Sequence, residues 1–84
     1  MDFEHLYMLS NGMAIYVEWI YFESDSWSYT IYQKDKIPIF WGYIDKNDIS
    51  SYEAAELALR KENLEDCLIL DTKLSYKEFF DNDY

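Results

Sequence analysis

The chain has 84 residues, half of them hydrophobic, including three Trp, nine Tyr and five Phe. This length predicts a single domain over residues 1–84, and the apolar content excludes a disordered chain. Seventeen Asp and Glu against seven Lys and Arg give a formal net charge of −10. That charge disfavours direct binding of nucleic acid or an anionic membrane, so we expect any charge-steered partner to be a basic protein.

The cysteine content and the N-terminal residues indicate where the protein works. Cys67 is the only cysteine, so no internal disulfide forms, which suits a reducing compartment. No run approaches the roughly 20 apolar residues of a membrane span. The first residues, MDFEHLYML, are acidic where a secretory signal is basic. We therefore expect a cytoplasmic protein, in the bacterial host cell if it is encoded by a phage.

The first third of the chain predicts two paired segments. Asn11-Gly12 separates two apolar runs and is typical of a tight hairpin turn, because both residues tolerate positive φ. The preceding residues 3–9 fit either a strand or a short helix. Residues 15–22 are β-branched and aromatic, interrupted only by Glu18, and this pattern predicts a central strand that is covered on both faces.

Two further strands are expected before residue 45. In residues 27–33, aromatic and aliphatic side chains alternate with Ser, Thr and Tyr, which predicts a strand with one solvated face. Residues 34–36 make a turn into a strand over residues 37–44. Pro38 lacks a backbone N–H, so this strand begins at Pro38 or lies at a sheet edge. These segments together form an antiparallel meander.

A helix follows over residues 51–61. Ser50 is placed to cap its first turn, and Glu53 is placed to reach back to Ser50. Two continuations remain open. The helix continues to about Leu70, with Leu57 and Leu64 on one stripe, or it breaks near Asn63 and residues 67–70 form a short strand. Residues 74–84 add a short helical turn before an acidic end.

The predicted fold is an α+β domain. A three- or four-stranded antiparallel sheet carries the Ser51 helix on one face, with a short C-terminal helical turn. The residues expected in the core are Ile15, Val17, Trp19, Trp27, Tyr29, Ile31, Ile39, Trp41, Ala54, Leu57 and Ala58.

The parts of catalytic and cofactor sites are mostly missing from the sequence. His5 is the sole histidine, and Cys67 has no neighbouring cation that would activate it, so a buried, inert thiol is expected. Gly12 and Gly42 are too far apart for a phosphate-binding loop. Residues 45–50 resemble a calcium loop, but lack its glycine and its distant glutamate, and are expected to form a solvated turn. We expect no catalytic residues, no metal and no cofactor.

Aromatic rings and uncompensated acids are the unusual feature of the chain. No Lys or Arg precedes Lys34, and the rings outnumber those that a domain of this size can hide completely. Exposed rings beside carboxylates are typical of protein interfaces that recruit Arg and Lys. The expected acidic surface comprises Glu18, Glu23, Asp25, Asp45, Asp48, Glu62, Glu65 and Asp66, and the expected aromatic anchors are Trp27, Tyr32 and Trp41.

Residues 27–61 resemble a loose class of small acidic phage and mobile-element proteins. Within them, the segment YQKDKIPIFWGYIDKND, residues 32–48, is similar to one hairpin of an acidic uracil-DNA glycosylase inhibitor, a protein that mimics DNA. This chain lacks the N-terminal helical segment of that inhibitor, so no functional residue carries over. The resemblance implies a viral or mobile-element inhibitor of host defence or DNA metabolism.

The expected function is therefore that of a small acidic inhibitor that binds a basic protein. In its most specific form it mimics DNA or RNA and blocks a nucleic-acid-binding host protein of the anti-defence type. The alternative is a non-catalytic interaction domain, or a homodimer that forms through exposed aromatic residues. Enzyme activity is the least favoured function.

Overall fold

The computed structural model describes residues 4–20, 26–74 and 76–81. Its elements in chain order are β1 (Glu4–Leu9), β2 (Ala14–Ile20), β3 (Ser26–Tyr32), β4 (Pro38–Ile44), α1 (Ser51–Lys61), β5 (Ile69–Leu74) and α2 (Tyr76–Asp81). The α+β class is confirmed, with one main helix and a short C-terminal helix. The sheet has five strands, because residues after α1 add β5 to the expected meander.

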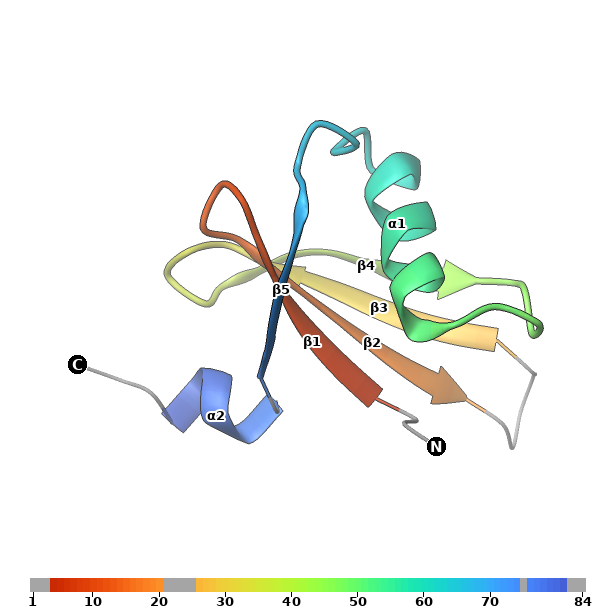
Figure 1. Ribbon diagram of the computed structural model, residues 1–84, viewed down its shortest axis with the longest axis horizontal. Coiled ribbons are helices and arrows are strands. Elements are labelled where there is room, and N and C mark those ends of the chain that lie inside the picture. Colours follow the sequence, from red (N-terminus) through yellow and green to blue (C-terminus); the bar gives the residue numbers. More distant parts are fainter. Residues whose placement is uncertain (1–3, 21–25, 75, 82–84) are drawn as a thin grey trace.

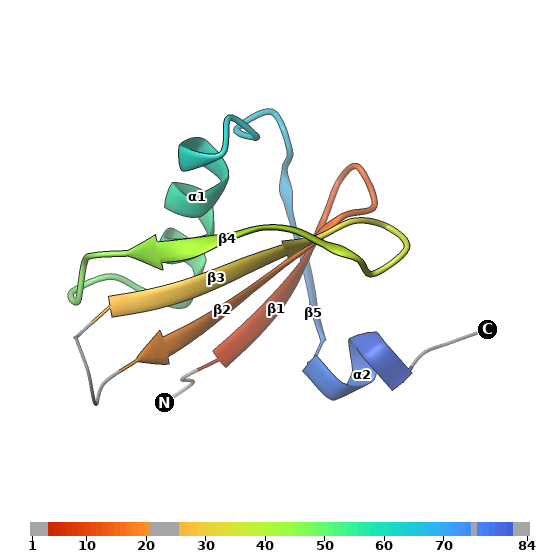
Figure 2. The same cartoon turned by 180° about the vertical axis from the view of Figure 1, so that it is seen from behind.

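The five strands form one antiparallel sheet in the order β4-β3-β2-β1-β5. Helix α1 lies in front of the sheet in Figure 1, and the strands lie in front of α1 in Figure 2. Helix α2 packs at one end of the molecule, next to β1 and β5. Among the described helices, none is long and apolar enough to cross a membrane.

The first hairpin forms at the Asn11-Gly12 turn, and the segment before the turn is a strand. Gly12 has a φ of 89°, and the backbone N–H of Leu9 donates to the Met13 carbonyl at 2.9 Å. Strand β2 lies between β1 and β3, which confirms its prediction as a central strand. Its face away from α1 is only partly covered, however, because Tyr16 and Glu18 are half-buried there. Strand β4 begins at Pro38 and lies at an edge of the sheet, where a missing N–H is tolerated.

Helix α1 has both of its ends defined by side-chain and backbone hydrogen bonds. The Ser50 hydroxyl accepts from the Glu53 backbone N–H at 3.2 Å, and it lies 3.3 Å from the Glu53 carboxylate. At the other end, Asn63 has a φ of 60°, and the Leu64 N–H donates to the Leu59 carbonyl at 2.7 Å. This arrangement is a Schellman motif. It confirms the break near Asn63 rather than a helix continuing to Leu70.

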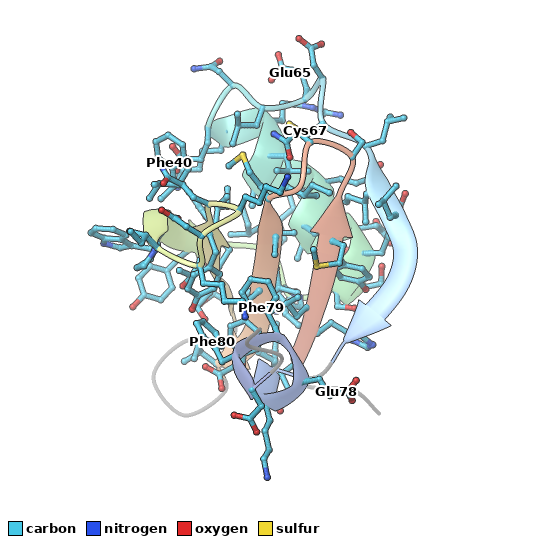
Figure 3. The ribbon with its side chains drawn as sticks, turned by 90° about the vertical axis from the view of Figure 1, so that its left-hand side faces the viewer. Phe40, Glu65, Cys67, Glu78, Phe79 and Phe80 are labelled. Atoms are coloured by element: carbon cyan, nitrogen blue, oxygen red, sulfur yellow. The ribbon has the colours of Figure 1, made fainter. Side chains whose placement is uncertain are left out.

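Apolar residues are buried on both faces of the sheet. Beneath α1, Ile15, Val17 and Ile31 from the central strands pack with the alanines of the helix. On the opposite face, Leu6, Ala14 and Tyr32 pack with Phe79 of α2. Figure 3 shows Phe79 and Phe80 beside the strands and Glu78 pointing away from them. A short helix thus covers part of the second face.

Most of the predicted core is confirmed, with one clear error. The predicted residues that are buried are Ile15, Val17, Trp27, Tyr29, Ile31, Ala54 and Ala58. Trp19, Ile39 and Leu57 are partly buried and pack against this core. Trp41 was predicted to be buried, but it is 69% exposed. Its partner in the register is Thr30, so its side chain stands on the sheet face away from α1.

Candidate functional site

The sheet face opposite α1 is only partly covered. Because side chains alternate along each strand, the register places two rows of residues across this face. One row runs Glu4, Glu18, Ser28 and Tyr43, and the other runs Leu6, Tyr16, Thr30 and Trp41. Leu6 is buried with α2. The remaining residues, which we call the open face, are Glu4, Tyr16, Glu18, Ser28, Thr30, Trp41 and Tyr43.

Two large aromatic rings are exposed on the edge-strand side of the open face. Trp41 is 69% exposed and Tyr43 is 63% exposed. They are two positions apart on β4, so they point to the same side of the sheet. Their neighbours on β3 are Thr30 and Ser28, whose short side chains do not cover a ring. Aromatic rings that stand clear of their neighbours in this way are available to a partner.

Two carboxylates lie on the β1 and β2 side of the open face, linked by a phenol. The Tyr16 hydroxyl donates to Glu4 Oε2 at 2.5 Å and to Glu18 Oε2 at 3.4 Å. Burial and the two neighbouring carboxylates raise the pKa of Tyr16 above its usual value. The phenol therefore keeps its proton and reduces the repulsion between the acids. Within the described part of the chain, no Lys or Arg forms an ion pair with either carboxylate.

The aromatic and acidic halves of the open face are close enough to contact one partner. Thr30 of β3 pairs with Tyr16 on one side and with Trp41 on the other. Neighbouring strands are about 4.8 Å apart, so the backbones of Tyr16 and Trp41 are separated by roughly 10 Å. This distance is well within the width of a standard protein interface. The open face thus joins aromatic rings to carboxylates without a compensating cation between them.

The acids predicted to form one surface are distributed over several parts of the fold. Glu18 lies on the open face, whereas Asp45 and Asp48 are exposed in the connection between β4 and α1. Glu65 and Asp66 are exposed in the turn after α1, and Figure 3 shows Glu65 at the end of the molecule opposite α2. Glu23 and Asp25 lie outside the described residues. The structure therefore does not gather the described acids into a single row.

Glu62 has a structural partner at the end of α1. The Tyr29 hydroxyl donates to Glu62 Oε2 at 2.5 Å, and the Lys61 ammonium lies 5.9 Å from the centre of the Tyr29 ring. Burial, followed by the hydrogen bond to the carboxylate, raises the pKa of Tyr29 to about 12. Tyr29 lies directly over Gly42 of β4, where no side chain obstructs the ring. Glu62 thus attaches the helix end to the sheet.

Two of the three predicted aromatic anchors are buried. Trp27 is 6% exposed and packs edge-on against Trp19, and its indole N–H has no hydrogen-bond partner in the described chain. Tyr32 is 7% exposed and contacts the rings of Phe79 and Phe80. Both residues lie on β3, an inner strand that α1 covers on one face and α2 covers on part of the other. The prediction that they are exposed is corrected, and Trp41 alone of the three reaches the surface.

Sequence reasoning missed one exposed ring and one carboxylate of the open face, Tyr43 and Glu4. Tyr43 is two positions from Trp41, so strand alternation alone places the two rings together. Glu4 faces Glu18 because β1 and β2 pair across the Asn11-Gly12 turn. The Asn11-Gly12 turn is evident from the sequence, and counting residues outward from this turn pairs Glu4 with Glu18.

The structure also brings together His5 and Ser51, which are far apart in the sequence. The Ser51 hydroxyl lies 2.7 Å from the Tyr7 hydroxyl and 3.2 Å from His5 Nδ1. A Ser–His pair is one part of a nucleophilic site, but catalysis also requires a pocket and oxyanion donors. These residues line neither the cavity beside Tyr52 and Cys67 nor the groove between β4 and α1. The cluster connects the start of α1 to β1.

Cys67 is half-buried rather than fully buried, which corrects the expectation of a core thiol. The Asn11 side-chain amide donates to Cys67 Sγ at 3.1 Å, so this residue links the first hairpin turn to the segment before β5. It also lines a cavity of about 140 Å³ together with Tyr52, Glu56 and Arg60. No group of three His, Cys, Asp or Glu side chains among the described residues is arranged to hold a metal ion.

Comparison of the chain with known protein families, with curated proteins and with solved structures found no match.

Proposed function

We propose that this protein is a non-catalytic binding domain whose open face binds a basic protein. The observation that carries the proposal is the exposure of Trp41 and Tyr43 on the same sheet face as the carboxylates of Glu4 and Glu18. A soluble domain gains nothing in folding from exposed rings. Aromatic anchors beside acids that lack a cation are instead typical of a surface that binds Arg or Lys.

The two halves of the open face have different roles in this proposal. Arg or Lys side chains of the partner pair with Glu4 and Glu18, which steers association and fixes the orientation of the complex. The rings of Trp41 and Tyr43 contribute most of the affinity, because their buried area is not screened by salt. The Tyr16 hydroxyl lies between the two carboxylates, donates its one hydrogen mainly to Glu4 and is 3.4 Å from Glu18.

The narrower proposal is that the basic partner binds nucleic acid and that this protein inhibits it by occupying its binding groove. The net charge of −10 supports this proposal, as do the exposed carboxylates of Asp45, Asp48, Glu65 and Asp66 outside the open face. Duplex DNA added to the complex then competes with the protein for the partner. If duplex DNA does not displace the protein, the proposal of a basic partner stands, but the proposal that the protein mimics nucleic acid is contradicted.

A second copy of the chain is the alternative partner, and one observation favours it. Strand β4 is an edge strand that carries both exposed rings, so two copies have a route to pair edge to edge. Two chains of charge −10 repel each other, however, and that repulsion is screened by salt. Salt therefore strengthens a homodimer and weakens a complex with a basic partner. Light scattering at rising salt measures the mass of the particles and so distinguishes the two alternatives.

The experiment is a capture assay on lysate of the native host cell, with matched variants of the tagged protein. We expect Trp41→Ala/Tyr43→Ala and Glu4→Lys/Glu18→Lys each to lose a basic protein that the wild type retains. The control is Glu65→Lys/Asp66→Lys, which makes the same change in net charge in the turn after α1. Equal retention of the partner by all four proteins would contradict the proposal, as would a partner that is acidic.

A further inference from the structure

An open groove lies between the end of β4 and the second half of α1. It has a volume of about 460 Å³ and is lined by Tyr43, Ile44, Asp45, Lys46, Leu57, Arg60 and Lys61. Ile44 is buried and Leu57 is partly buried, so the groove has an apolar floor. Its lining residues come from the end of β4, from the segment that follows β4 and from α1. We call this site the basic groove.

Three of the seven Lys and Arg residues of the chain line the basic groove, although the chain as a whole carries ten excess negative charges. Lys61 donates to the Tyr43 carbonyl at 3.2 Å and keeps two further N–H donors. Within the described part of the chain, neither Lys46 nor Arg60 forms an ion pair. Such unpaired cations give this part of the surface a positive charge, opposite in sign to the net charge of the chain.

Helix electrostatics account for only part of this cluster. Arg60 and Lys61 are in the last turn of α1, where cations interact favourably with the helix dipole. Lys46 belongs to the segment after β4, so the preference of a helix for cations in its own last turn does not explain its position. Asp45 is the single acid that lines the groove, so the cations outnumber it by three to one. The groove is therefore suited to a ligand that brings negative charge.

The shape of the basic groove selects the kind of ligand. The groove is open to solvent rather than enclosed, so it does not surround a small molecule. An extended chain can lie along it, with an apolar side chain over Leu57 and carboxylates beside Lys46 and Arg60. We propose that the basic groove binds an acidic, extended segment of a partner protein. Tyr43 lines the basic groove and also belongs to the open face. The inference does not rest on the proposed function, however, because the cations and Leu57 that it concerns lie outside the open face.

The test is fluorescence anisotropy with a labelled ten-residue peptide of Glu, Thr and Val. We expect Lys46→Gln/Arg60→Gln to weaken binding about threefold to tenfold, because two exposed charge pairs are lost. The matched control is Lys34→Gln/Lys77→Gln. It removes two exposed cations that do not line the groove, and it gives the same net charge. This control is expected to stay within about twofold of the wild type.

Two outcomes overturn the proposal. One is an equal loss of affinity in both variants, since this would show that only net charge matters. The other is absence of peptide binding at concentrations up to about 1 mM, which is weaker than useful recognition. A peptide with Gln in place of Glu tests the wild-type protein directly, so the result does not depend on variants that fold. Binding of the Gln peptide as tight as that of the Glu peptide also overturns the proposal.

Discussion

At the scale of single residues, the contact between Gly42 and Tyr29 controls how closely β4 approaches the core. A Cβ atom at position 42 would lie 2.7 Å from the Tyr29 hydroxyl oxygen and 2.9 Å from Cζ. Tyr29 is 2% exposed and its hydroxyl is bonded to Glu62, so the ring has little room to move. The absence of a side chain at Gly42 therefore permits the tyrosine to attach α1 to the sheet edge.

We predict that Gly42→Ala lowers the free energy of unfolding by about 1–3 kcal/mol, the usual cost of overpacking a filled site. Urea denaturation followed by circular dichroism measures this change. The same substitution in a Tyr29→Ala background should cost much less, because the clashing atoms are gone. An equal cost in both backgrounds would show that the contact with Tyr29 is not the cause.

The raised pKa of Tyr29 predicts a loss of stability in alkali. An unfolded tyrosine ionises near pH 10, whereas the folded residue holds its proton to about pH 12. Between these values the unfolded state binds fewer protons, so the free energy of unfolding falls as the pH rises. Below pH 10 this contribution is fully present.

The matched variant for this prediction is Tyr29→Phe, which keeps the ring and removes the titrating group. We expect the wild type to lose more stability than Tyr29→Phe between pH 10 and pH 12, as measured by urea denaturation at each pH. Parallel curves for the two proteins would refute the assignment, because other tyrosines and lysines titrate equally in both.

At the scale of elements, the end of α1 determines whether a fifth strand forms. Asn63 adopts a left-handed conformation, which ends the helix and turns the chain toward β5. Asn and Gly tolerate this conformation, whereas β-branched residues do not. The apolar stripe formed by Leu57, Leu64 and Leu68 would otherwise favour a longer helix.

We predict that Asn63→Val destabilises the protein by about 1 kcal/mol or more and that Asn63→Gly is neutral or stabilising. Thermal or urea unfolding of the two variants checks this order. If Val and Gly at this position gave the same stability, the left-handed turn would not be what ends the helix.

Strands β2, β3 and β4 and helix α1 were predictable because their signals are local, whereas the residues of β1 fit either a strand or a helix and β5 was only an alternative over residues 67–70. The Asn11-Gly12 turn, the alternation in β3, Pro38 at the start of β4 and the Ser50 cap each act within a few residues. The exposure of particular rings was not predictable, since it depends on which strand becomes an edge and on where α2 packs. Tyr32 is buried by a helix more than 40 residues away, while Trp41 on the edge strand has no such cover.

At the scale of the whole molecule, the open face and the basic groove differ in the sign of the charge that they carry. The open face carries Glu4 and Glu18, and the basic groove on the other side of the sheet carries Lys46, Arg60 and Lys61. No Lys or Arg precedes Lys34 in the sequence. Such a separation of charge supports the binding of partners with different charges on the two sides of one small sheet.

The central claim is that the open face binds a basic protein, and association kinetics test it most directly. With the captured partner, stopped-flow mixing gives the association rate constant at rising salt for the wild type, Glu4→Lys/Glu18→Lys and Glu65→Lys/Asp66→Lys. We predict a rate that falls with salt and falls further, by tenfold or more, only in the Glu4/Glu18 variant. A rate that is indifferent to salt, or that falls equally in both variants, would contradict the claim.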